Sequence, residues 1–394
     1  MKEKRRIRIM IVWVVLLLIV AGNMFADTFA EGSEDLNGSM EEVIDHLDTE
    51  KLQEYLDSLT QEQREAFGSN FAEKLKSLIT GDFSLDYDGI LSSLSGIFFD
   101  QISGLLPVFC VICAVSVLCG ILGRFKSSFA ERGTSKMIFF VGYSAVLVLI
   151  LTSLSGIVQD CGSTVHSLQV QMQAIFPVLL TLIATSGGSV SVAVYQPAVL
   201  LLSEIIVDIV AGIVFPLAAM ICVLNMVGNM SQEIKLKNFS NLFASVIKWV
   251  LGLSLTAFTV FLTVQGITSA TYDGLSFKAA KYAVSNTVPI IGGFLGSGFD
   301  LVIAGSVLIK NSVGSCGIFL LVIVLIVPLV QLIAYNLFLK LAAAVTEPIG
   351  DTGISNFLSS LSGTVNYFTA GLLAVGFMYF ITVLLLICSS NTLF

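Results

Sequence analysis

Apolar residues fall in long runs that are separated by short polar stretches. A helix of about 20 apolar residues crosses the hydrocarbon core of a bilayer. Because such runs recur from residue 103 to residue 388, the pattern predicts an all-α polytopic membrane protein. The predicted apolar segments are residues 104–123, 137–158, 173–186, 197–230, 249–270, 288–309, 313–339 and 367–388.

Three of these segments do not have the length or continuity of one regular span. Segment 173–186 is short for a crossing, and segment 197–230 is longer than one crossing needs. Segment 288–309 has a proline near its start and glycines in its middle. Counting apolar runs therefore does not decide the topology.

The segment before the first span has a different pattern. Residues 31–100 hold most of the acidic side chains and read as short amphipathic helices. Thr60 and Gln63 form a capping-box pattern, and Asn70 precedes another helical stretch. One helical face carries apolar residues at Leu52, Tyr55, Leu56 and Leu59. We expect a small extracytoplasmic helical domain, followed over residues 88–103 by an amphipathic helix that leads into the membrane.

Residues 1–30 have the layout of a secretory signal peptide. A basic start is followed by an apolar stretch and by small residues at Ala26 and Ala30, either of which suits cleavage. An uncleaved signal anchor is the alternative. Both interpretations place the residues that follow outside the cytoplasm. Residues 101–394, which hold the apolar runs, form the multi-span body.

Internal repeats organise this body. Three pairs of like residues are each separated by 112 positions: Lys136 and Lys248, Pro177 and Pro289, Pro216 and Pro328. This interval predicts repeats over about 124–235 and 236–347, with a partial third copy over 348–394.

Repeats of equal orientation require an even number of crossings per copy. We therefore predict re-entrant helical hairpins at about 173–207 and 288–309, which enter and leave on one side. Their breaks fall at Pro177, Gly187, Gly188, Pro289, Gly292, Gly296 and Gly298, with tips at 187–188 and 296–298. Broken helices survive at membrane depth only where protein or water covers the backbone. The alternative is a full span in which Gly292 and Gly296 permit close helix packing.

Basic residues favour the hairpin topology. It gathers eight Lys and Arg residues in the cytoplasmic loops 124–136, 231–248 and 340–366, against three outside. If every apolar segment crosses, the ratio falls to seven against four. The difference is small, but it points the same way as the repeats.

Four ionisable residues lie inside apolar stretches and are candidate pore or polar membrane residues. Glu204 and Asp208 are four positions apart and share a helix face, while Asp300 and Lys310 follow the second predicted hairpin tip. Ionisable groups in spans commonly mark ion or substrate pathways. For Glu204 and Asp208 the competing interpretation is a solvated interfacial site, and for Asp300 it is a buried polar contact.

Composition narrows the classes of function. The chain is 55% hydrophobic and 12% charged, with a mean hydropathy of +0.91 and a net charge of −8. Seven cysteines lie almost entirely in apolar runs, and the two histidines belong to no metal-binding motif. We expect no catalytic residues, no metal, no cofactor and no nucleic-acid partner, and hence no enzyme.

Three stretches carry a family resemblance: residues 281–314 (KYAVSNTVPIIGGFLGSGFDLVIAGSVLIKNSVG), 195–205 (YQPAVLLLSEI) and 347–361 (EPIGDTGISNFLSSL). They resemble the stage III sporulation protein AE family of endospore-forming bacteria, and the likeness extends over essentially the whole chain. It implies a multi-pass protein of the mother-cell membrane around the forespore. It also implies membership of a channel complex, with other membrane proteins of that complex as partners.

Two hypotheses follow. The first is a structural or pore-forming membrane subunit of the mother-cell-to-forespore channel, in contact with the lipid bilayer and with its N-terminal domain outside the cytoplasm. The second is a stand-alone secondary transporter that uses Asp300, Glu204 or Asp208. A homo-oligomer is compatible with both.

Overall fold

The computed structural model describes residues 50–67, 70–79, 87–126, 132–186, 188–230, 236–287, 292–349 and 352–388. Every regular element in these ranges is helical, as the sequence predicts. The short N-terminal helices are α3 (Glu50–Ser58), α4 (Gln61–Phe67) and α5 (Phe71–Ile79). The long ones are α6 (Tyr87–Lys126), α7 (Arg132–Thr185), α8 (Ser189–Ile209), η1 (Val210–Val214), α9 (Phe215–Met230), α10 (Lys237–Thr287), α11 (Gly292–Ile349) and α12 (Thr352–Cys388).

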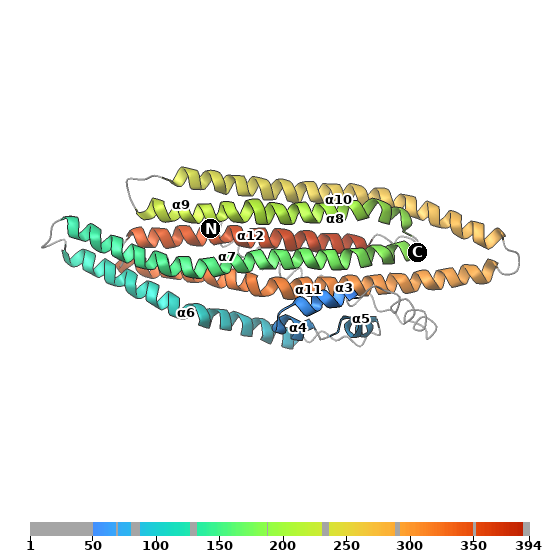
Figure 1. Ribbon diagram of the computed structural model, residues 1–394, viewed down its shortest axis with the longest axis horizontal. Coiled ribbons are helices and arrows are strands. Elements are labelled where there is room, and N and C mark those ends of the chain that lie inside the picture. The colour runs from blue at the N-terminus through green and yellow to red at the C-terminus, as the bar shows by residue number, and fades with distance from the viewer. Residues whose placement is uncertain are drawn as a thin grey trace.

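The long helices lie side by side as an elongated antiparallel bundle (Figure 1). Helices α8, η1 and α9 follow one another in a single rod, and the π-helical turn η1 directly precedes Pro216, near the start of α9. The chain reverses between α6 and α7, between α9 and α10 and between α11 and α12 at one end of the bundle (Figure 1). The stretches around these loops, 124–136, 231–248 and 340–366, hold eight of the eleven Lys and Arg residues of positions 101–394.

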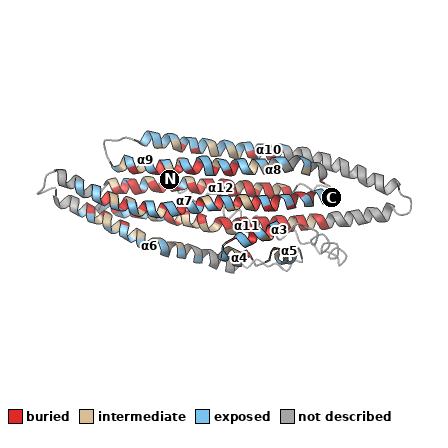
Figure 2. Cartoon of the chain, in the orientation of Figure 1, coloured by how far each residue is buried: buried red, intermediate tan, exposed pale blue. Residues whose placement is uncertain are grey.

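The core of the bundle lies along α11 and α12. Buried residues dominate these two helices, whereas α10 is largely exposed (Figure 2). Glycines permit close packing here: a Cβ added at Gly371 would lie 2.7 Å from Cε1 of Phe215 in α9. Burial of apolar side chains along α11 and α12 therefore stabilises the bundle.

Six helical stretches among the described residues are long and apolar enough to cross a membrane, which makes the chain a multi-pass membrane protein. They are Phe98–Cys119, Phe140–Thr185, Leu201–Met230, Lys237–Val264, Gly305–Pro348 and Gly353–Cys388. Several exceed one crossing. Helix α7 has 54 residues, about 80 Å at 1.5 Å per residue, whereas the hydrocarbon core is about 30 Å thick.

The structure agrees with one part of the predicted hairpin at 173–207 and corrects another. The turn is where the glycines place it, since α7 ends at Thr185 and α8 begins at Ser189. However, segments 137–158 and 173–186 belong to one continuous helix, so the chain does not reverse between them. Pro177 lies inside α7 and does not break it. That the turn lies at membrane depth stays a prediction.

The second predicted tip is wrong. Helix α11 begins at Gly292 and continues through Gly296 and Gly298 without a break, so segments 288–309 and 313–339 are parts of one helix. Pro289 lies outside the described residues, between α10 and α11.

The repeats stay a prediction. Helices α7 and α10 each precede a rod that runs the opposite way (Figure 1). The structural setting of Pro177 and Pro289 cannot be compared, because Pro177 lies within α7 whereas Pro289 is outside the described residues. Residues 1–30, with the predicted signal peptide, lie outside the described residues.

The capping box and the apolar face predicted for the N-terminal helices are confirmed. Thr60 and Gln63 form the reciprocal capping box at the start of α4: the Thr60 N–H donates to Gln63 Oε1 at 3.2 Å, and the Gln63 N–H to Thr60 Oγ1 at 3.4 Å. The predicted apolar face is buried, at Leu52, Tyr55, Leu56 and Leu59. It packs on α7, and α5 packs on α11, so these helices do not form a separate body.

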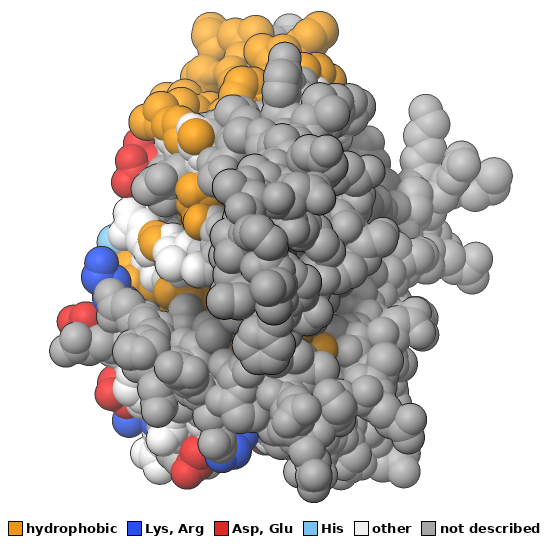
Figure 3. Space-filling model, turned by 90° about the vertical axis from the view of Figure 1, so that its right-hand side faces the viewer, with side chains coloured by type: hydrophobic (Ala, Val, Ile, Leu, Met, Phe, Trp, Pro, Cys, Tyr) orange, Lys and Arg blue, Asp and Glu red, His pale blue; other side chains and the backbone are white. Residues whose placement is uncertain are grey.

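The outer face of α10 is strongly apolar. Trp249 is 78% exposed and Leu253 is 67% exposed. Viewed along the bundle, hydrophobic side chains gather on the α10 side, and the coloured charged side chains lie below them (Figure 3). An exposed face of this kind on a membrane helix is suited to contact with lipid.

Candidate functional site

The most extensive buried polar contact joins the N-terminal helices to the membrane body. We call it the junction, made of Tyr55, Gln171, Gly317 and Tyr379. Tyr55 Oη of α3 donates to Gln171 Oε1 of α7 at 3.2 Å. Gln171 Nε2 lies 3.0 Å from both the Gly317 carbonyl of α11 and Tyr379 Oη of α12. Tyr379 Oη donates in turn to the Gly317 carbonyl at 3.2 Å. Four helices therefore meet at one glutamine side chain.

Each junction residue is placed by its own helix. Gln171 is wholly buried, so its amide needs partners, and these come from three other helices. Gly317 permits this approach, because a Cβ there would lie 3.0 Å from Tyr379 Oη and 3.1 Å from Ile175 Cδ1. The ring of Phe176 stacks on Tyr379 with centroids 5.5 Å apart. The junction is thus both hydrogen-bonded and closely packed.

Burial also sets the protonation of Tyr55. Loss of water around its hydroxyl raises the pKa of Tyr55 to about 12, and the hydrogen bond with Ser167 opposes this only in part. Tyr55 is therefore neutral at physiological pH and acts as a hydrogen-bond donor. Its role in the junction is structural.

A second contact lies beside the junction and is aromatic. Phe67 of α4 packs on Phe319 of α11 with ring centroids 5.9 Å apart, and on Phe71 of α5 at the same distance. Lys74 Nζ lies 5.4 Å from the Phe319 ring centroid, and burial lowers the pKa of Lys74. All three N-terminal helices are thus fixed to the bundle.

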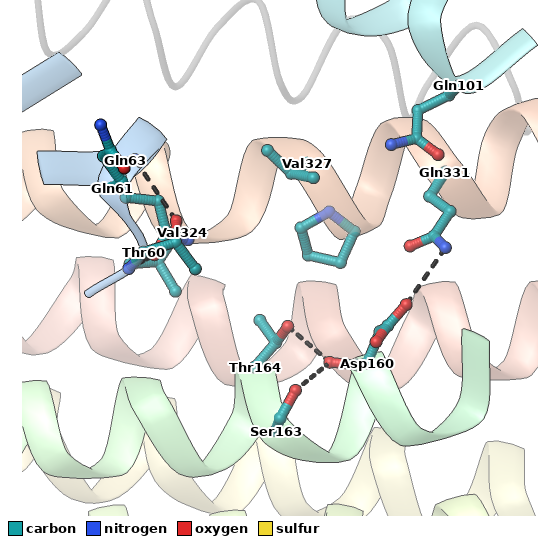
Figure 4. Close-up of a pocket in the computed structure, with 11 residues that line it drawn as sticks. Thr60, Gln61, Gln63, Gln101, Asp160, Ser163, Thr164, Val324, Val327 and Gln331 are labelled. Carbon is teal, nitrogen blue, oxygen red and sulfur yellow. Dashed lines mark hydrogen bonds between the residues drawn. The ribbon is translucent and has the colours of Figure 1, made fainter. Parts of the chain in front are cut away.

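A polar cavity of about 720 Å³ opens next to these helices (Figure 4). Its lining comes from α4 with the residue before it, and from α6, α7 and α11: Thr60, Gln61, Gln63, Gln101, Asp160, Ser163, Thr164, Val324, Val327, Pro328 and Gln331. Gln331 Nε2 donates to Asp160 Oδ2 at 3.1 Å. Ser163 and Thr164 donate to the Asp160 backbone carbonyl. Among the described residues that line the cavity, none is Lys or Arg.

Polar side chains also link helices within the membrane body. Asn336 Nδ2 of α11 donates to Asn366 Oδ1 of α12 at 2.7 Å and to the Ser362 carbonyl at 3.0 Å. Asn225 of α9 donates to Thr364 Oγ1 and accepts from Ser240 Oγ of α10. Such interhelical hydrogen bonds are worth about 0.6–2 kcal/mol in membranes. They fix the register of α9, α10, α11 and α12.

Of the four predicted ionisable residues, the three with described side chains are divided between the exposed surface of α8 and the interior of α11. Glu204 and Asp208 are exposed on α8, where Glu204 accepts a hydrogen bond from Gln173 Nε2 at 3.2 Å. Lys310 is completely buried in α11, one turn after the equally buried Ser306. Asp300 lies in α11, but the surroundings of its side chain are outside the described residues. Their role as pore residues stays a prediction.

Sequence reasoning missed the junction and the cavity. It searched for ionisable groups, whereas the junction is made of neutral side chains. One signal was available for the cavity: Gln331 is an amide within an otherwise apolar helical stretch, whereas Gln171 lies among other polar residues and does not stand out. A buried amide needs several hydrogen-bond partners, so such a residue marks a polar contact between helices.

The fold and these contacts define a class, that of helical multi-pass membrane proteins in which short N-terminal helices are docked on a long bundle. The model of the stage III sporulation protein AE family matches residues 69–390, and the chain belongs to this family. It is 28% identical over 388 residues to stage III sporulation protein AE of Bacillus subtilis (strain 168), which covers 96% of this chain and 97% of the relative. No solved structure matches the chain. Family membership gives the chain a role in sporulation.

Proposed function

We propose that this chain is a non-catalytic membrane subunit of a channel complex between mother cell and forespore. It lies in the mother-cell membrane around the forespore, with α3–α5 outside the cytoplasm. Its role there is to build or line the channel together with other membrane proteins. The family and the multi-pass fold support this proposal.

The junction is the observation that carries the proposal. A tethered N-terminal domain would move independently of the membrane helices. Here Gln171 and the Phe67–Phe319 contact hold α3–α5 rigidly against α7 and α11. The N-terminal helices and the side of the bundle formed by α7 and α11 therefore offer one composite surface (Figure 1), which suits a subunit that assembles with others.

The first test is topological. Single cysteines replace exposed residues at Glu54→Cys in α3 and Asn238→Cys in α10, in a background that lacks the exposed Cys110 and Cys388. In sporulating cells we expect a membrane-impermeant maleimide to label position 54 from outside and position 238 only after permeabilisation. External labelling of both positions, or of position 238 alone, would contradict the proposed orientation.

The second test is assembly. The full chain, expressed in place of the family member of an endospore former, should co-purify with other membrane proteins during sporulation. Purified alone in liposomes, it should show no solute-coupled flux. Coupled transport by the isolated protein, with no co-purifying membrane protein, would favour the stand-alone transporter instead.

A further inference from the structure

Helices α6 and α11 lie side by side, and we call the surface between them the seam. The seam is polar near Gln101 and Gln331 and apolar further along both helices. Gln101 of α6 and Gln331 of α11 line the polar cavity described above. One helical turn further along each helix, Leu105 and Tyr335 begin a groove that is lined entirely by apolar or aromatic side chains. Its residues are Leu105, Val108, Phe109, Ile112, Tyr335, Phe338, Leu339 and Ala342. The two helices run in the same direction (Figure 1), so cavity and groove follow one another along the seam.

The position of the seam relates it to the bilayer. The apolar span of α6 is Phe98–Cys119, so Gln101 lies in its first turn and Val108 lies inside it. The polar cavity is therefore at the level where the span leaves the hydrocarbon, and the groove is within the hydrocarbon. A lipid has the same order of parts, with a polar headgroup above an acyl chain.

The charge of the cavity indicates which kind of lipid headgroup it can bind. The carboxylate of Asp160 lies at the cavity, and no described lining residue is basic to neutralise it. Pro328 has no N–H, so the carbonyl of Val324, one of the residues that line the cavity, receives no helical hydrogen bond from it. The one charged side chain among the described lining residues is therefore an anion. It fits a cation that donates hydrogen bonds and repels a headgroup of net negative charge.

We propose that the α6–α11 seam binds a zwitterionic membrane lipid with a primary-ammonium headgroup, such as phosphatidylethanolamine. The ammonium donates to Asp160, the amides of Gln101 and Gln331 donate to the lipid phosphate, and one acyl chain follows the groove. The groove has a volume of only about 20 Å³, so the chain lies along it and not inside it. Two of its lining residues, Phe109 and Phe338, contact each other with ring centroids 5.3 Å apart.

The test uses the full chain in nanodiscs of phosphatidylcholine with equal small fractions of phosphatidylethanolamine and phosphatidylglycerol. After transfer to detergent, native mass spectrometry identifies the retained lipid. We expect one phosphatidylethanolamine per chain. Choline has no N–H to donate and phosphatidylglycerol is anionic, so neither should be retained to the same extent. Preferential retention of either would overturn the proposal.

Two pairs of variants locate the site. Asp160→Asn removes the charge with little change of shape, and Val108→Phe fills the groove from its half-exposed side. We expect Asp160→Asn to lower retention about tenfold or more, because a hydrogen bond to a charged group is worth about 1.5–3 kcal/mol. Val108→Phe should lower retention because its ring takes the place of the acyl chain. The matched controls are Asp100→Asn and Val111→Phe, exposed positions of α6 outside the seam. Equal retention in Asp160→Asn and Asp100→Asn would overturn the proposal.

A competition arm separates lipid from soluble ligand. Glycerophosphoethanolamine carries the same headgroup without acyl chains. We expect it not to displace the lipid at millimolar concentration. If it binds as tightly as the lipid, and Val108→Phe has no effect, the site takes a soluble amine and the lipid proposal is wrong. Circular dichroism and the elution volume of each variant establish that it is folded.

Discussion

Tyr55 Oη lies 3.2 Å from Gln171 Oε1, and this hydrogen bond is buried between the N-terminal helices and the membrane body. Gln171 is held from the other side by Gly317 and Tyr379. The contact therefore links a polar N-terminal segment to the innermost helices of the bundle. Removing it should release α3 without unfolding the bundle.

The first prediction concerns Tyr55→Phe. The variant keeps the buried ring but leaves Gln171 Oε1 without its donor, which costs about 1–3 kcal/mol. We expect faster hydrogen exchange in α3–α5 of the full chain in nanodiscs, with little change in α11 and α12. The exposed substitution Glu54→Gln on the same helix is the control. Equal exchange in α3–α5 of Tyr55→Phe and of the native protein would show that the hydrogen bond does not hold α3.

The second prediction is a loss of docking at high pH. The folded pKa of Tyr55 is about 12, above its ordinary value of 10.0. The neutral hydroxyl is therefore favoured in the docked state, and its contribution is complete below pH 10 and lost as the pH rises from 10 toward 12. Limited trypsin digestion of α3–α5 between pH 8 and pH 11.5 measures this loss.

Tyr55→Phe is the control for the second prediction, because phenylalanine has no hydroxyl to titrate. The other tyrosines remain in both proteins, so the difference between the two pH curves isolates Tyr55. Curves of the same steepness would mean that titration of Tyr55 does not control docking.

The third prediction concerns Gly317. In Gly317→Ala the new Cβ would lie 3.0 Å from Tyr379 Oη and 3.1 Å from Ile175 Cδ1, in wholly buried surroundings. We expect a loss of about 1–3 kcal/mol from overpacking. The matched control is Gly363→Ala in α12, where a Cβ meets nothing within 4 Å.

Removal of glycine from a helix interior stabilises by about 1 kcal/mol where space permits. Gly363→Ala should therefore raise the midpoint of thermal unfolding in detergent, and Gly317→Ala should lower it. The prediction is contradicted if Gly317→Ala raises the midpoint as much as Gly363→Ala does. In that case the close approach at Gly317 is not required for packing.

The fourth prediction concerns the capping box of α4. Thr60→Ala removes the acceptor for the Gln63 N–H and should cost about 1 kcal/mol of helix stability. Thr60→Ser retains a hydroxyl and should restore most of this loss. Hydrogen exchange at the N-terminus of α4 is the measurement. An unchanged rate in Thr60→Ala would indicate that packing of Phe67, and not the cap, fixes α4.

Local signals were sufficient for much of this protein. Apolar runs predicted a helical membrane body, and the capping pattern and the face of Leu52, Tyr55 and Leu56 predicted α3 and α4. These features depend on residues close together in the chain, so propensity and periodicity reveal them. The turn between α7 and α8 was found in the same way, from glycine.

The continuity of α7 was decided by tertiary structure alone. Its polar stretch around Gln159–Gln173 reads as a loop in sequence, since polar residues usually mark the end of a span. It is helical here, with Val165, Leu168 and Gln171 completely buried on one face. Tyr55 of α3 contacts this face. A hydropathy value depends on the residue alone and not on its tertiary contacts. It therefore cannot show that another part of the chain covers a polar segment. The sequence alone determined the apolar helices, the cap of α4 and the turn between α7 and α8, because residues close together in the chain encode these features. Only the packing of distant segments decided that the polar stretch of α7 is helical, where α3–α5 dock and which polar side chains meet, because those contacts join residues more than a hundred positions apart.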